Sequence, residues 1–205
     1  MKFATGLLPA LTLSAQALTV PIGLHSRFDV NSILALVSKL FPFDVTLEAA
    51  QTLTVAAEEA LALAEGFKTT RQDLDDGKCS DLLVIFARGT DEPGNVGALV
   101  GPPFFKALEG ALGSSHTLAV QGVEYEATVS DYLGGGDPEG SQEISADFRA
   151  DSSQSVENTD PGKVLVVCHN GDDICQFGDL ILLQHLTYAQ DAETAADFVV
   201  SKAGF

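Results

Sequence analysis

The chain has 205 residues, with 11 basic and 29 acidic side chains and a formal net charge of −18 at pH 7. This charge argues against binding to nucleic acid or to anionic lipid, because both interactions need a positive surface that displaces counterions. The length corresponds to one domain with an N-terminal extension.

Residues 1–17 have the pattern of a secretory signal peptide. Lys2 supplies the positive start, residues 3–13 form an apolar run, and Ala15 and Ala17 are small residues at the cleavage positions. The apolar run is too short to cross a bilayer, and no later stretch is long enough. We therefore expect a secreted, extracellular protein that does not enter the membrane.

Residues 18–78 are predicted to form a helical pro-segment or extension that ends in a linker. One helix is expected after Asn31, and a second between Thr46 and Gly66, because these residues are good helix caps. The polar, charged character of residues 69–78 is typical of a linker. The apolar stripe of the second helix is predicted at Leu53, Ala57, Leu61 and Ala64.

Residues 79–205 have the pattern of an α/β domain. Strands are predicted at residues 82–86, 117–123 and 164–167, and the continuous apolar run of the first is typical of a strand buried on both faces. Helices are expected between these strands and after them, and this order predicts a parallel sheet that is covered on both sides. The expected helices lie between Pro102 or Pro103 and Gly113, at residues 181–186, and at residues 192–202.

The stretch from residue 134 to residue 163 does not fit this pattern. It is rich in glycine, serine and acidic residues, and nothing in it resembles a buried strand. A segment of this length without structure is uncommon inside a compact domain. We predict a loop or a disordered segment here.

Three cysteines leave one thiol unpaired, which is unusual in a secreted chain. Cys168 and Cys175 are close enough in the sequence to close a short loop, and this pairing leaves Cys79 alone. Two interpretations of Cys79 stay open. It is a buried free cysteine, or its partner is no longer in the chain.

The loop between Cys168 and Cys175 carries Asp172 at the end of a predicted strand, and His185 follows ten residues after Cys175. A carboxylate that orients an imidazole, which then acts as a general base, is the supporting half of a nucleophilic triad. The spacing alone does not establish this role, because an isolated Asp and His are more often surface or packing residues.

The residues themselves resemble a known family. Residues 168–175 (Cys-His-Asn-Gly-Asp-Asp-Ile-Cys) and the later Gln184-His185-Leu186 are similar to the C-terminal catalytic block of fungal cutinases, although Gln184 stands where the family usually has proline. Residues 87–95 (Ala-Arg-Gly-Thr-Asp-Glu-Pro-Gly-Asn) are similar to the family's oxyanion loop. The resemblance covers roughly residues 79–142 and 163–205.

This resemblance implies a secreted serine esterase with a three-layer, α/β-hydrolase-type parallel sheet. By the family pattern, His185 would be the general base, Asp172 would orient it, and Thr90 would help to hold the oxyanion. The resemblance also implies a disulfide between Cys168 and Cys175. The substrates would be plant cutin and smaller esters, and the reaction would need no metal or organic cofactor. The chain would act as a monomer.

The family's nucleophile is missing from this sequence. Cutinases need a Gly-x-Ser-x-Gly turn between a strand and a helix, and no such motif occurs here. By the family order it belongs between Val123 and Asp172, and the family's partner for Cys79 lies just before it. Loss of one strand–turn–helix segment explains both absences, whether through a real deletion or through a splice site that was assigned wrongly.

Ser141 is a poor substitute for this nucleophile, because it has no apolar strand before it and glutamate in place of the second glycine. The nucleophile is therefore unknown. The alternative function is that of a catalytically inactive secreted remnant or a mis-spliced product. Without its central strand, the sheet is expected to be incomplete and to expose apolar faces.

Overall fold

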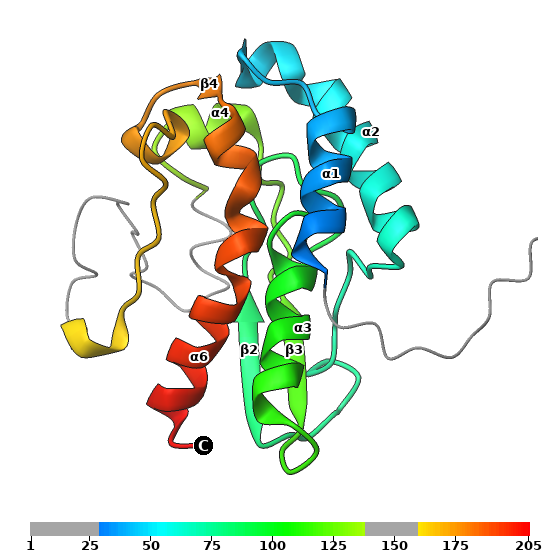
Figure 1. Cartoon of the computed structure of the whole chain (residues 1–205), viewed down its shortest axis with the longest axis vertical. Coiled ribbons are helices and arrows are strands. Elements are labelled where there is room, and N and C mark those ends of the chain that lie inside the picture. The colour runs from blue at the N-terminus through cyan, green and yellow to red at the C-terminus, as the bar shows by residue number, and fades with distance from the viewer. Residues whose placement is uncertain (1–28, 138–159) are drawn as a thin grey trace, which may run out of the picture.

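The computed structural model describes residues 29–137 and 160–205, and the predicted signal peptide and Ser141 lie outside these residues. Helices cover one face of a small parallel sheet, and two further helices lie beside it (Figure 1). The elements are α1 (Val30–Leu40), β1 (Val45–Thr46), α2 (Leu47–Glu65), β2 (Leu82–Phe86), α3 (Gly101–Leu112), β3 (Leu118–Gly122), α4 (Val129–Leu133), η1 (Pro161–Lys163), η2 (Ile174–Gln176), β4 (Leu180–Ile181), η3 (Leu183–Asp191) and α6 (Ala192–Ala203).

Side-chain caps fix the ends of the two N-terminal helices. Asp29, two residues before the expected cap Asn31, accepts a hydrogen bond from the Asn31 backbone N–H at 3.0 Å and starts α1. Thr46 accepts from the Ala49 N–H at 3.3 Å and starts α2, as predicted. Gly66 ends α2 in the left-handed conformation, with φ of 68°, which glycine adopts without strain.

The N-terminal helices share a hydrophobic core with the C-terminal part of the chain. Ile33 and Val37 of α1 and Leu61 of α2 are buried against Ile181 and Leu186. The short strand β1 also pairs antiparallel with β4. The N-terminal extension is therefore packed into the domain that carries the candidate site.

The segment predicted as a linker, residues 69–78, packs against the domain instead. The buried side chain of Asn95 accepts from the Arg71 N–H at 2.8 Å and donates to the Arg71 carbonyl at 3.1 Å. Asp73 accepts from the Val120 N–H at 2.9 Å and forms ion pairs with Arg71 and Lys78. Polar composition alone did not reveal these contacts, because the charges are paired with each other at the edge of β3.

A two-stranded parallel sheet forms the centre of the domain. β2 and β3 pair in register from Leu82 opposite Leu118 to Phe86 opposite Gly122. Phe105 of α3 packs on this sheet, with its ring centroid 5.1 Å from that of Phe86 in an edge-to-face arrangement. α6 runs beside α3 on the same face (Figure 1).

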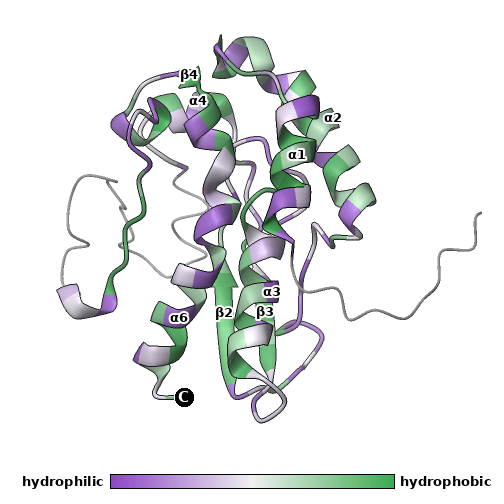
Figure 2. Ribbon diagram, in the orientation of Figure 1, coloured by the Kyte–Doolittle hydropathy of each residue, from purple (hydrophilic) through white to green (hydrophobic). Residues whose placement is uncertain are grey.

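The opposite face of β2 differs from the prediction. Leu83 and Ile85 are 42% and 54% exposed, so β2 is not buried on both faces. Residues 164–167 form no strand, and Leu165 and Val166 are 40% and 52% exposed. The physical reason is that a strand needs a hydrogen-bonded neighbour, and no described strand lies beside these residues. Figure 2 shows β2 as hydrophobic along its length.

Candidate active site

Asp172 is held in a loop closed by a disulfide between Cys168 and Cys175, whose Cα atoms are 6.0 Å apart. Its own N–H donates to the His169 carbonyl at 3.0 Å, and its Oδ1 accepts from the Ile174 N–H at 3.1 Å. The side chain is completely buried. The loop therefore presents one fixed carboxylate oxygen, Oδ2, to its surroundings.

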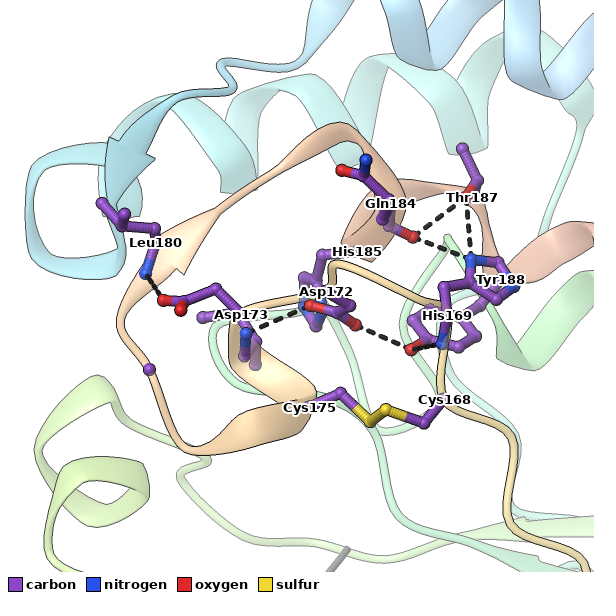
Figure 3. Close-up of polar contacts among 12 residues, drawn as sticks. Cys168, His169, Asp172, Asp173, Cys175, Leu180, Gln184, His185, Thr187 and Tyr188 are labelled. Carbon is purple, nitrogen blue, oxygen red and sulfur yellow. Dashed lines mark hydrogen bonds and ion pairs between the residues drawn. A yellow bond between two sulfur atoms is a disulfide. The ribbon is translucent and has the colours of Figure 1, made fainter.

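His185 lies at the start of η3 and meets that oxygen (Figure 3). Its Nδ1 is 3.1 Å from Asp172 Oδ2, and about a third of its side chain is exposed. Because Nδ1 faces the carboxylate, Nε2 is the nitrogen left to exchange a proton with another molecule. The structure thus brings together the two residues that the sequence predicted as a pair.

Tyr188 is a third member of this group, and sequence reasoning did not identify it. Its hydroxyl donates to Asp172 Oδ2 at 2.7 Å and accepts from the His169 N–H at 3.0 Å. Burial and the bond to the carboxylate raise the pKa of Tyr188 to about 12. Burial opposes the charge of Asp172, but the hydrogen bonds from Tyr188 and His185 prevail and lower its pKa. Asp172 is therefore an anion at neutral pH.

His169 contacts Tyr188 and supports the group formed by Asp172, His185 and Tyr188. Its Nε2 is 2.6 Å from Asp191 Oδ2, and its ring stacks on that of Tyr188 with centroids 4.1 Å apart. Its Nδ1 is 3.0 Å from the Gln184 carbonyl and from Thr187 Oγ1. These contacts tie both ends of η3 to the disulfide loop and hold Tyr188 in place.

A cavity of about 360 Å³ lies in front of His185, and Thr90 lines it too. Thr90 and His185 therefore line the same cavity, although they come from distant parts of the chain. Apolar and aromatic side chains form much of the remaining wall, including Phe86, Leu99, Val100, Ile181 and Leu186.

The loop that carries Thr90 is built around the buried side chain of Glu92. Its carboxylate accepts from the Gly89 N–H at 2.8 Å and from the Leu99 N–H at 3.2 Å. Gly97 has φ of 66°, and a Cβ there would lie 2.1 Å from Glu92 Oε2, so only glycine fits. These bonds hold the backbone around Thr90 in one conformation.

No serine among residues 29–137 and 160–205 lines this cavity. Ser141, Ser152, Ser153 and Ser155 lie outside the described residues. Within the described part of the chain, no three His, Cys, Asp or Glu side chains are grouped so that they could hold a metal ion.

The fold is similar to that of Trichoderma reesei cutinase solved in complex with a C11Y4 phosphonate inhibitor, with a TM-score of 0.65 and 39% sequence identity. The match covers 86% of this chain and 99% of that one. The fold is therefore of the α/β-hydrolase type found in cutinases, with an incomplete parallel sheet in its described part.

The cutinase family model matches residues 78–155 and 149–203. A cutinase of Hypocrea jecorina is 40% identical over 216 residues, covering 83% of this chain and 85% of the relative. Cutinase cut1 of Trichoderma harzianum is 37% identical, with the same coverage of both chains. The chain belongs to the cutinase family, and the resemblance seen in the sequence is confirmed.

The alignments also bear on the missing segment. The Hypocrea jecorina alignment spans 216 residues, whereas 83% of this chain is only about 170 residues. It therefore includes positions at which only the relative has a residue. The family model matches in two segments, which overlap at residues 149–155. The 170 residues also exceed the length of segment 79–205, so this relative matches part of the N-terminal extension.

Proposed function

We propose that this protein is a secreted serine esterase of the cutinase type, which hydrolyses carboxylic esters of plant cutin and smaller esters. One observation carries the proposal. A buried carboxylate, Asp172, hydrogen-bonds Nδ1 of a partly exposed imidazole, His185, at the wall of a cavity that Thr90 also lines. Family membership supplies the reaction class.

In the proposed mechanism, Nε2 of His185 removes the proton of a serine hydroxyl as that oxygen attacks the ester carbonyl. Asp172 keeps the imidazole in the required tautomer and stabilises its positive charge. His185 then gives the proton to the leaving alcohol, and water repeats the sequence on the acyl-enzyme. Thr90 would contribute to stabilising the oxyanion that forms in both steps.

The cavity wall supports an ester with an apolar acyl group. Phe86, Leu99 and Leu186 line it beside His185, so an alkyl chain would bury apolar surface on binding. The net charge of −18 is suited to a neutral substrate and to release of an acidic product.

The nucleophilic serine is not among the described residues that line the cavity. We propose that it belongs to the segment that the relatives have and this chain lacks, which would join near residues 149–155. We therefore predict that the chain of 205 residues is inactive, because an aspartate and an imidazole cannot form an acyl-enzyme without a hydroxyl. An inactive remnant or a mis-spliced product is the alternative function.

The test compares the 205-residue chain with a chimera in which the segment containing the Gly-x-Ser-x-Gly motif of the Hypocrea jecorina relative is inserted at residues 149–155. Hydrolysis of a short-chain p-nitrophenyl ester and labelling by a fluorophosphonate are measured. We expect activity and labelling only in the chimera. His185→Ala in the chimera should lower kcat by about 10⁴-fold or more, and Thr90→Val by about 10²-fold.

Labelling of a serine in the 205-residue chain would contradict the predicted inactivity. An active chimera that His185→Ala leaves unchanged would refute the role of His185. No helix in residues 29–137 and 160–205 is long and apolar enough to cross a membrane. The proposed secretion predicts that the extracellular protein lacks residues 1–17. The intact mass of the secreted protein tests this and also shows whether a further segment is present.

A further inference from the structure

A buried acid on α2 has no role in the mechanism above. Glu58 is only 2% exposed, although it belongs to a helix whose other buried residues are alanine and leucine. Its Oε2 is buried and has no hydrogen-bond partner among the described residues. An ionised carboxylate in such a position would be strongly destabilising, whereas a protonated one would not.

The carboxyl group of Glu58 lies close to that of Glu92 from the Thr90 loop, and both residues line the cavity in front of His185. Two carboxyl groups that are buried close together are not both charged, so one of them carries a proton. Glu92 accepts backbone N–H bonds from Gly89 and Leu99, which favour its charged form. Glu58 is therefore assigned as the protonated member of the pair and Glu92 as the charged one.

The charges around the pair agree with this assignment. Burial, the contact with Glu92 and the nearby charge of Asp91 raise the pKa of Glu58 to about 10. Burial also raises the pKa of Glu92, but the backbone N–H groups and the guanidinium of Arg88 oppose that effect. The other titratable groups that face this region are Tyr125, beside Glu92, and Tyr132, His185 and Tyr188 across the cavity.

We propose that Glu58, as a neutral carboxylic acid, is a positioning residue that ties α2 to the loop of residues 88–99 and so fixes Thr90. A second contact supports the tie, because Gln51 of α2 donates to Asp91 Oδ1 at 3.2 Å. The effect of the tie on oxyanion binding rests on the proposed function, whereas the tie itself does not.

The direction of the pH dependence follows from the linkage between protonation and folding. The pKa of Glu58 is raised in the folded state, so its contribution to stability is complete below the ordinary value of 4.5 and is lost as the pH rises through about 10. Above that pH two adjacent buried carboxylates repel each other. The contact between α2 and the Thr90 loop should then open while the rest of the fold remains.

The experiment follows the side-chain carboxyl ¹³C signal of Glu58 and the methyl ¹³C signal of Thr90 by NMR in the 205-residue chain from pH 4 to 11. We expect Glu58 to titrate near pH 10 and the Thr90 methyl to shift with the same midpoint. Glu58→Gln keeps a neutral donor and should abolish the alkaline shift of Thr90. The matched control is Glu59→Gln, which removes an exposed acid from the same helix and should behave like wild type.

Tyrosines also ionise at alkaline pH, and the glutamine variant separates their effect from that of Glu58. The proposal is overturned if the Glu58 signal titrates near pH 4–5, or if Thr90 shifts equally in Glu58→Gln and wild type. The wild-type titration alone decides the first point, so the proposal remains testable even if the variant folds poorly. Because no measurement uses ester hydrolysis, failure of the proposed esterase function would leave this result unaffected.

Discussion

The hydroxyl of Tyr188 lies 2.7 Å from Oδ2 of Asp172, the same oxygen that faces His185 Nδ1 at 3.1 Å. The carboxylate is therefore held by two donors on η3 in addition to the N–H groups of its own loop. Without the Tyr188 hydroxyl, the buried Oδ2 of Asp172 would have only the His185 imidazole as a partner. The phenol both stabilises the charge and limits where the carboxylate can point.

Tyr188→Phe is expected to raise the pKa of Asp172, because it removes a hydrogen bond to the charged form. Loss of a bond to a charged group should also lower the free energy of unfolding by about 1.5–3 kcal/mol at pH 7. Carboxyl ¹³C NMR measures the first effect and urea unfolding the second. Tyr132→Phe is the control, since that hydroxyl donates to the Ile174 and Gly178 carbonyls. An unchanged Asp172 pKa in Tyr188→Phe would contradict the assignment.

Asp73→Asn should destabilise the protein at neutral pH but much less in acid. Burial opposes the charge of Asp73, yet hydrogen bonds from Arg71, Lys78 and the Val120 N–H hold its pKa well below its usual range. A lowered pKa stabilises the fold above the ordinary value of 3.8, and this contribution is lost as the pH falls below it. Urea unfolding should show a loss of about 1.5–3 kcal/mol at pH 7 that shrinks toward pH 2.

The control for Asp73 is Asp76→Asn. Asp76 is 64% exposed and lies 4.0 Å from the same lysine, Lys78. Exposed ion pairs contribute about 0–1 kcal/mol, so this variant should stay close to wild type at every pH. Equal effects of the two variants would mean that the burial of Asp73 has no energetic consequence.

Ile85→Thr is expected to change stability little and to reduce self-association. Ile85 is 54% exposed on β2, and an exposed apolar strand favours pairing between chains. The change in unfolding free energy should stay within about 0.5 kcal/mol, while light scattering at rising concentration should fall. Val84→Thr, on the packed face of the same strand, should instead cost about 1–3 kcal/mol. A larger loss of stability in Ile85→Thr than in Val84→Thr would mean that the exposed and packed faces of β2 are assigned wrongly.

Cys79→Ser should abolish intermolecular disulfides. Cys79 is exposed and unpaired in the described structure, whereas Cys168 and Cys175 are bonded to each other. In an oxidising buffer, a non-reducing gel should show dimers of the wild-type chain that disappear with reductant. Dimers that persist in the serine variant would have to arise from opening of the Cys168–Cys175 disulfide.

Local signals in the sequence predicted much of the helical structure. Thr46 and Gly66 mark the ends of α2 because capping depends on residues next to each other in the chain. The same holds for Gly113 at the end of α3. The pairing of Asp172 with His185 was predicted by the family resemblance and not by the spacing alone, and the structure shows that hydrogen bond.

Features that depend on distant partners were not predicted. The two-residue strands β1 and β4 are too short to leave a period in the sequence, and each exists because it pairs with the other. Leu53, expected in the apolar stripe of α2, is 61% exposed, whereas Glu58, which was not part of that stripe, is buried. A buried acid at such a position has no local signature, because its neighbour Glu92 lies far along the chain.

The pairing of β1 with β4 connects the N-terminal region to the segment that leads to His185. Asp44 donates its N–H to the Ile181 carbonyl and Leu47 to that of Asp179, each at 2.8 Å, and Ile181 precedes His185 by four residues. A protease that trimmed the chain back to the start of β2 would remove these donors and uncover Ile181. Maturation of that kind would therefore make the position of His185, the proposed general base, less fixed, and would not activate the enzyme.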